Sequence, residues 1–152
     1  MSAVMDAAAR RHDTPETHSH VVRPAQMEWK KTRFAGCEVK GLLLDKESGV
    51  VTALMKWAPG AVLPDHEHVK IEQTYVLEGR LVDKDGPAAG LSVGPGEFVW
   101  REAGSRHSAW APEGALMLAM FQVPNKFFEK DGRVTDLSGV DWDELWGHIL
   151  HD

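Results

Sequence analysis

The stretch from Gly60 to Gly79, GAVLPDHEHVKIEQTYVLEG, decides how the chain folds and what it binds. His66 and His68 are two residues apart, and residues two apart in a β-strand point to the same face. Two imidazoles on one face can both reach a single metal ion at about 2.0–2.2 Å. Glu72 then offers a carboxylate from the strand that we expect to follow. The stretch therefore predicts half of a metal site, framed by two glycines where the backbone turns.

Outward from this stretch, short apolar runs alternate with turn signals every eight to twelve residues, the pattern of an all-β sandwich or barrel. We expect strands at 50–57, 73–77, 98–101, 106–110 and 115–123, and a hairpin turn at 129–132. The end of the chain differs, because five apolar residues form one helical stripe: Trp142, Leu145, Trp146, Ile149 and Leu150. This stripe predicts a short amphipathic helix over 141–151. Residues 1–25 are polar and are expected to form a flexible tail, so residues 26–152 make one domain.

Composition excludes several classes of protein. With 152 residues the chain is long enough to bury a core without disulfide bonds. A net charge of −6 gives no electrostatic surface for nucleic acid or for an anionic membrane. Cys37 is the single cysteine, and no run of apolar residues is long enough for a signal peptide or a membrane span, so we expect a cytoplasmic protein.

His107 is the candidate to complete the site, because an intervening hairpin can bring its strand back beside the first one. It ends the segment from Gly96 to His107, GEFVWREAGSRH, which again reads as turn, strand, turn and strand. Together the two stretches resemble the two motifs of the cupin superfamily. The first matches at every fixed position, whereas the second departs from the family at Glu102 and Ala111, which are not ligand positions.

The resemblance implies a small antiparallel β-barrel of two packed sheets, with a metal held inside by His66, His68, His107 and Glu72. It also implies a homodimer or homotetramer. Imidazole and carboxylate ligands suit Fe²⁺, Mn²⁺, Ni²⁺ or Zn²⁺, and we favour Fe²⁺. Glu72 is expected either to be a fourth ligand or to lie behind the histidines as an outer carboxylate. No catalytic residue is assigned beyond the metal ligands.

Among cupins the chain resembles the small dioxygenases that use O₂ to cleave a C–C bond of a β-dicarbonyl or hydroxyketone, including acetylacetone-cleaving enzymes, which use three histidines without the glutamate. Two alternatives remain open: a non-redox isomerase or lyase, and a ligand-binding sensor with a structural zinc, similar to the cupin domain of ChrR-type anti-sigma factors. The helical sigma-docking module of those factors is expected to be absent here. Arg101 and Arg106 are candidates to orient an anionic enolate or to form surface ion pairs. The candidate wall of the substrate pocket comprises Met55, Trp57, Thr74, Val76, Phe98, Trp100, Ala109 and Met120.

Overall fold

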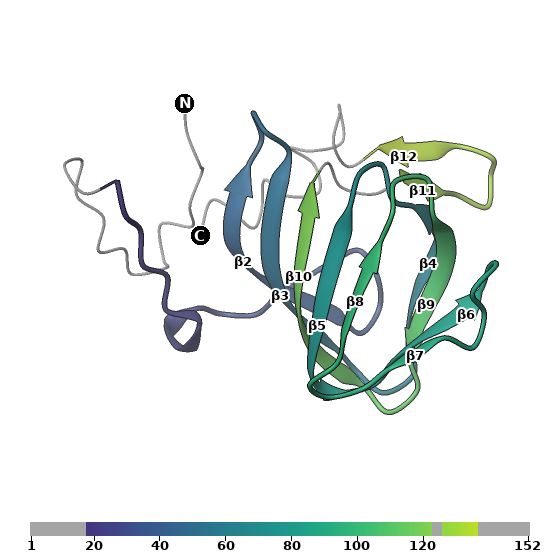
Figure 1. The fold of residues 1–152 in the computed structure, drawn as a ribbon, viewed down its shortest axis with the longest axis horizontal. Helices are drawn as coiled ribbons and strands as arrows, with labels where there is room; N and C mark the ends of the chain where they lie inside the picture. The colour runs from purple at the N-terminus through teal and green to yellow at the C-terminus, as the bar shows by residue number, and fades with distance from the viewer. Residues whose placement is uncertain (1–17, 123–125, 137–152) are drawn as a thin grey trace.

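Buried and exposed residues alternate along most strands, and the strands assemble into two antiparallel sheets of six strands that face each other (Figure 1). The computed structural model describes residues 18–122 and 126–136. Its elements are η1 (Pro24–Gln26), β1 (Lys30–Lys31), β2 (Cys37–Asp45), β3 (Val50–Trp57), β4 (Ala61–Glu67), β5 (Glu72–Gly79), β6 (Leu81–Asp85), β7 (Ser92–Val93), β8 (Phe98–Arg101), β9 (Arg106–Ala111), β10 (Ala115–Gln122), β11 (Lys126–Phe128) and β12 (Val134–Asp136).

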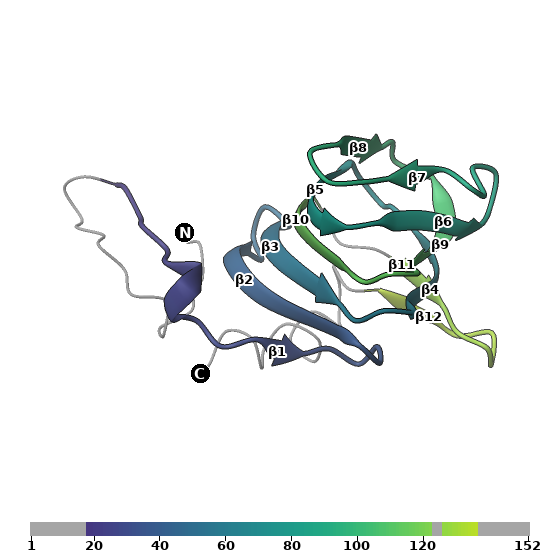
Figure 2. The ribbon, with the colours of Figure 1, turned by 90° about the horizontal axis from the view of Figure 1, so that it is seen from below.

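One sheet has the strand order β1-β2-β3-β10-β5-β8, and the other has the order β12-β11-β4-β9-β6-β7. Successive strands pass from one sheet to the other, as when β3 leads into β4 and β9 into β10, so the two layers are joined by many turns (Figure 2). The expectation of an all-β fold with two packed antiparallel sheets is therefore confirmed. Residues 1–17 and the helix expected at 141–151 lie outside the described residues. Within the described residues, no helix is long and apolar enough to span a membrane.

The core between the sheets divides into two apolar clusters. One lies around Val51, Phe121 and Phe127, and the other around Trp57, Val76 and Met117. Half-buried residues, among them Met55 and Leu63, pack against both clusters. The polar site described below therefore has an apolar interior beneath it.

A β-bulge in β4 decides which side chain points inward beside His107. Leu63 pairs with Ala109 and His66 pairs with His107, so β4 advances three residues over the stretch in which β9 advances two. In an unbulged strand Asp65 would stand opposite His107 and face the interior. The extra residue moves His66 to that position, and Pro64 fits within the bulge because it cannot donate a ladder hydrogen bond.

Candidate metal centre

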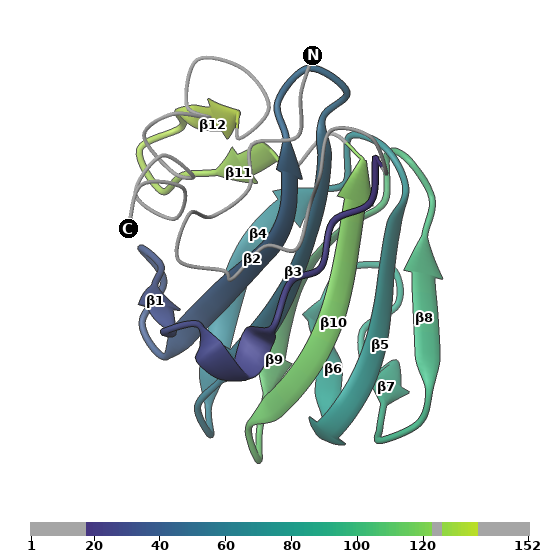
Figure 3. The ribbon, with the colours of Figure 1, turned by 90° about the vertical axis from the view of Figure 1, so that its left-hand side faces the viewer.

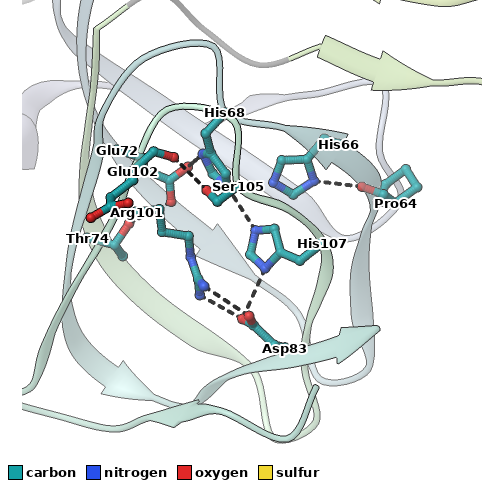
Figure 4. Close-up of polar contacts among 10 residues, drawn as sticks. All are labelled: Pro64, His66, His68, Glu72, Thr74, Asp83, Arg101, Glu102, Ser105 and His107. Atoms are coloured by element: carbon teal, nitrogen blue, oxygen red, sulfur yellow. Dashed lines mark hydrogen bonds and ion pairs between the residues drawn. The ribbon is translucent and has the colours of Figure 1, made fainter. Parts of the chain in front are cut away.

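Three buried imidazoles meet inside the barrel, and their ligand atoms all lie within 4.8 Å of one another (Figure 4). His66 comes from β4, His107 comes from β9, and His68 follows one residue after the end of β4. None of the three is more than 5% exposed. The structure thus brings together the three histidines that the sequence motifs selected.

Each ring has an oxygen beside its Nδ1 atom, on the side away from the other rings (Figure 4). His66 donates a hydrogen bond from Nδ1 to the carbonyl oxygen of Pro64 at 2.7 Å. Nδ1 of His68 lies 2.7 Å from a carboxylate oxygen of Glu72, and Nδ1 of His107 lies 3.0 Å from one of Asp83. An acceptor beside Nδ1 favours a proton on that nitrogen and leaves the Nε2 lone pair for a metal.

The distance between two of these Nε2 atoms fits a metal ligand set. Nε2 of His68 lies 3.0 Å from Nε2 of His107. Two lone pairs at this distance repel each other unless a proton or a cation binds both. Two imidazoles bound to one metal at about 2.1 Å and at right angles have nitrogen atoms about 3.0 Å apart. The residues present therefore fit a divalent transition metal held by His66, His68 and His107.

Electrostatics keep the His66 imidazole neutral and the two carboxylates beside the histidines ionised. Burial, and then the charges of His107 and His68, lower the pKa of His66 to about 3, so this imidazole is neutral at pH 7. Burial raises the pKa of Glu72, but the adjacent His68 lowers it more, and the pKa falls to about 2. Burial likewise opposes ionisation of Asp83, yet His107 and Arg101 hold its pKa below the ordinary value. Both carboxylates are thus ionised.

Glu72 lies behind His68 at the start of β5 rather than among the three converging ring nitrogens. Its Oε2 atom contacts the His68 ring, while its Oε1 atom accepts a hydrogen bond from Thr74 at 3.1 Å. Both oxygens thus have protein partners. Of the two roles expected for Glu72, this arrangement favours the outer carboxylate.

Asp83 and Arg101 form a buried pair that the sequence did not reveal. Arg101 donates to both carboxylate oxygens of Asp83, at 2.9 and 2.6 Å, and each residue is at most 8% exposed. Arg101 comes from β8 and Asp83 from β6, so the pair joins the two sheets directly beneath His107. Asp83, a charged residue at an inward position of β6, was the feature of the sequence that could have indicated this pair. Arg106, by contrast, forms an exposed ion pair with Asp65. A surface ion pair was one of the two roles expected for Arg106.

The residues expected to line a pocket divide between the interior of the barrel and the outer face of the first sheet. Thr74, Val76 and Ala109 are buried on the interior side together with Trp57, and Met55 is half-buried there. Phe98, Trp100 and Met120 instead point to the outer face, where they are 51%, 55% and 36% exposed. These three do not lie beside the histidines. The reason is that Val99 and Arg101 take the inward positions of β8.

Comparison with known families shows which family the chain belongs to. The sequence profile of the ChrR cupin-like domain matches residues 17–126, which is most of the chain. The chain belongs to the ChrR cupin-like family. A search of curated proteins finds no match.

Several solved structures share the fold of this ChrR-like cupin. A putative acetylacetone dioxygenase from Methylibium petroleiphilum is 22% identical, with a TM-score of 0.69 over 82% of this chain and 92% of its own. An acetylacetone dioxygenase from Acinetobacter johnsonii is 17% identical, with a TM-score of 0.65 over 86% and 89%. The anti-sigma factor ChrR of Rhodobacter sphaeroides, in complex with SigE, is 22% identical with a TM-score of 0.53. There the match covers 66% of this chain and 51% of that one.

Proposed function

We propose that this protein is an Fe²⁺-dependent dioxygenase that cleaves a C–C bond of a small β-dicarbonyl or hydroxyketone. The observation that carries the proposal is the convergence of three buried imidazoles, each with an oxygen beside Nδ1. Three protein ligands leave other positions on a metal open for substrate and O₂. The structural similarity to acetylacetone dioxygenases supports this reaction class.

The charges around the site favour an anionic ligand. Glu72 and Asp83 are negative, Arg101 is positive, and the three imidazoles are neutral when they bind a metal, so the protein contributes a net charge of −1. A divalent cation brings the total to +1. The enolate of a β-dicarbonyl carries one negative charge and two oxygens that can bind one metal, and it would neutralise the site.

The chain's own residues have defined parts in such a reaction. Bound iron would supply Lewis acidity toward an enolisable ligand and redox chemistry with O₂. His66, His68 and His107 would hold it, while Glu72 and Asp83 fix the orientation of two of the rings. Burial of all three rings limits the access of water.

Oxygen consumption tests the proposal directly. The protein is loaded with Fe²⁺ without air, and O₂ uptake is followed with a panel of small β-diketones and hydroxyketones, with His107→Ala as the control. We expect uptake with at least one compound and none with the control. If the iron-loaded protein consumes no O₂ with any member, the dioxygenase proposal fails. Turnover without O₂ would indicate the isomerase or lyase alternative.

A second candidate function is a ligand-binding or sensing cupin with a structural zinc. It is favoured by the family match and by the similarity to ChrR in complex with a sigma factor. Metal analysis of protein purified without added metal separates the two. Stoichiometric zinc that resists chelators, combined with no O₂ uptake after iron loading, would support the sensor.

A further inference from the structure

One side of the barrel, beside His66, is closed by contacts between aromatic side chains. The β1-β2 edge of the first sheet and the β12-β11-β4 edge of the second lie on this side, whereas β8 and β7 lie on the opposite side (Figure 3). Phe34, between β1 and β2, has its ring centre 4.8 Å from that of Phe127 on β11. The ring centre of Phe127 lies 5.2 Å from that of His66. A row of three rings therefore leads from this side of the barrel to the candidate metal ligands.

Arg33 holds the two edges together across this row. Its guanidinium carbon lies 4.5 Å from the ring centre of Phe34 and 5.1 Å from that of Phe127. Nη1 of Arg33 also lies 2.8 Å from Oε1 of Glu129, and these side chains are 33% and 24% exposed. Thr135 on β12 donates a hydrogen bond to the same oxygen of Glu129 at 2.7 Å. We call Arg33, Phe34, Phe127 and Glu129 the seam latch.

The hairpin of β11 and β12 is a unit with few attachments to the rest of the barrel. β11 pairs with β12 over three residue pairs but with β4 over only two, and the amide of Glu129 donates to the carbonyl of Arg133 within the hairpin. On the outer side, the guanidinium carbon of Arg106 lies 3.7 Å from the ring centre of Phe128, and the Arg106 side chain is 52% exposed. Movement of the hairpin away from β4 would break these contacts and the seam latch, but it would leave the hairpin itself intact.

The opposite side of the barrel is closed in a more costly way. There Arg101 donates to both carboxylate oxygens of Asp83, and the two residues are 8% and 2% exposed. Separation of a buried ion pair costs far more free energy than separation of a pair that water reaches. Of these two sides, the one with the seam latch therefore opens more readily.

The three candidate ligands are almost completely enclosed. His66, His68 and His107 are at most 5% exposed, so a hydrated metal ion needs an opening in the barrel to reach them. We propose that the β11–β12 hairpin is the gate of the metal site, that the seam latch keeps it closed, and that Phe127 moves away from His66 when it opens. The proposal rests on a metal bound by the three histidines, but it does not depend on the reaction that the metal supports.

A gate has a kinetic signature that a purely structural contact lacks. Metal crosses the same barrier on its way in and on its way out. A weaker latch should therefore raise the rates of uptake and release by the same factor and leave the Kd unchanged. Local opening that limits both rates should also expose the backbone amides shared by β11 and β4 to hydrogen exchange.

Stopped-flow uptake of Zn²⁺ by the metal-free full chain, and release of Zn²⁺ to a chromogenic chelator, test the gate. Glu129→Gln removes the ion pair and should raise both rates about 2–5-fold. Arg33→Gln also removes the contacts with the two rings and should raise both rates about 10-fold or more. Exchanging the charges, with Arg33→Glu and Glu129→Arg together, should return both rates toward those of the wild type.

Glu38→Gln is the matched control for the loss of an ion pair. Glu38 pairs with Lys56 at 3.3 Å, and the two side chains are 32% and 43% exposed, but the pair lies between β2 and β3 outside the seam latch. Both exchange rates should therefore stay as in the wild type. Equal circular dichroism would show that each variant folds.

Hydrogen exchange supplies a second measurement, and three results decide the proposal. In Arg33→Gln the amides shared by β11 and β4 should exchange faster, while the amide of Glu129 stays protected within the hairpin. Unchanged rates in folded Arg33→Gln overturn the gate, because metal then enters elsewhere. Faster release with a weaker Kd and unchanged uptake also overturns it, because the latch then only positions His66. Zn²⁺ exchange as expected without any O₂ uptake by the iron-loaded protein would keep the gate and reject the dioxygenase proposal alone.

Discussion

Replacing Asp83 by Asn tests whether the buried pair with Arg101 holds the site together. Asp83 accepts two hydrogen bonds from Arg101 and lies 3.0 Å from Nδ1 of His107, with 2% of its surface exposed. Removing its charge leaves the buried guanidinium uncompensated, which costs about 3–5 kcal/mol in comparable cases. An asparagine still accepts one bond, so we expect a loss of about 3 kcal/mol in the free energy of unfolding.

The chain offers a matched control for this substitution. Asp65 likewise accepts hydrogen bonds from Arg106 with both carboxylate oxygens, a bidentate contact at 2.6 to 3.2 Å, but both side chains are about half exposed. Water and salt screen an exposed pair, so Asp65→Asn should change stability little. Denaturant unfolding of metal-free protein with chelator present compares the two variants without the stabilisation that bound metal adds.

A double variant separates stability from metal affinity. Asp83→Leu combined with Arg101→Met removes both charges, and it should recover most of the stability that Asp83→Asn loses. It cannot restore the carboxylate beside His107, so metal affinity should stay about 10–100-fold below that of the wild type. If Asp83→Asn is no more destabilising than Asp65→Asn, the buried pair does not stabilise the fold as expected. If the double variant binds metal as tightly as the wild type, the carboxylate of Asp83 does not support metal binding through His107.

Three further predictions concern single residues. Glu72→Gln should lower metal affinity by about 10–100-fold without abolishing binding, measured by competition with a chromogenic chelator; complete loss of metal would instead make Glu72 a ligand. Gly79→Ala should destabilise the fold more than Gly60→Ala. Both glycines have positive φ, which costs another residue about 1–2 kcal/mol, but only at Gly79 would the added Cβ overlap a neighbouring backbone carbonyl. Equal melting temperatures of the two variants would contradict this prediction. Burial raises the pKa of Cys37 from 9.0 to about 11, so the stabilisation from a protonated thiol is complete below pH 9 and is lost between pH 9 and 11. Between pH 9 and 11 the wild type should therefore lose more free energy of unfolding than Cys37→Ala. If the free energies of the two proteins change with pH in parallel, burial of Cys37 does not have this effect.

Much of the fold could be predicted because local signals and tertiary structure agree. The strand expected at Val50–Trp57 is β3, and the one expected at Phe98–Arg101 is β8, because turn residues bound both runs. The turn expected at 129–132 joins β11 to β12, with the amide of Glu129 bonded to the carbonyl of Arg133. The three histidines followed from the spacing of the two motifs, although His68 lies one residue beyond the end of β4.

Two features of the site could not be predicted from spacing. The run Phe98-Val99-Trp100 is apolar on both of its faces, so alternation alone does not say which face is inward. The structure turns Arg101 inward, and a buried guanidinium is tolerated only because Asp83 arrives from the opposite sheet. Similarly, the pairing of His66 with His107 depends on a bulge; Pro64 is compatible with a bulge, but it does not determine how the register shifts.

A metal held by the three histidines would couple its binding to the closure of the two sheets. His66 and His107 belong to one sheet, whereas Glu72, which contacts His68, begins a strand of the other. The Asp83–Arg101 pair crosses between the sheets beneath the same rings. A metal that binds all three imidazoles would tie the loop after β4 to β9 and, through Glu72, to β5. Because it binds only the folded chain, it should raise the free energy of unfolding by about 2.7 kcal/mol at a free concentration of about 100 times its Kd. Thermal melts with and without Fe²⁺ or Zn²⁺ measure this increase. In His66→Ala the increase should vanish, whereas in His20→Ala, which changes an exposed histidine outside the site, it should persist.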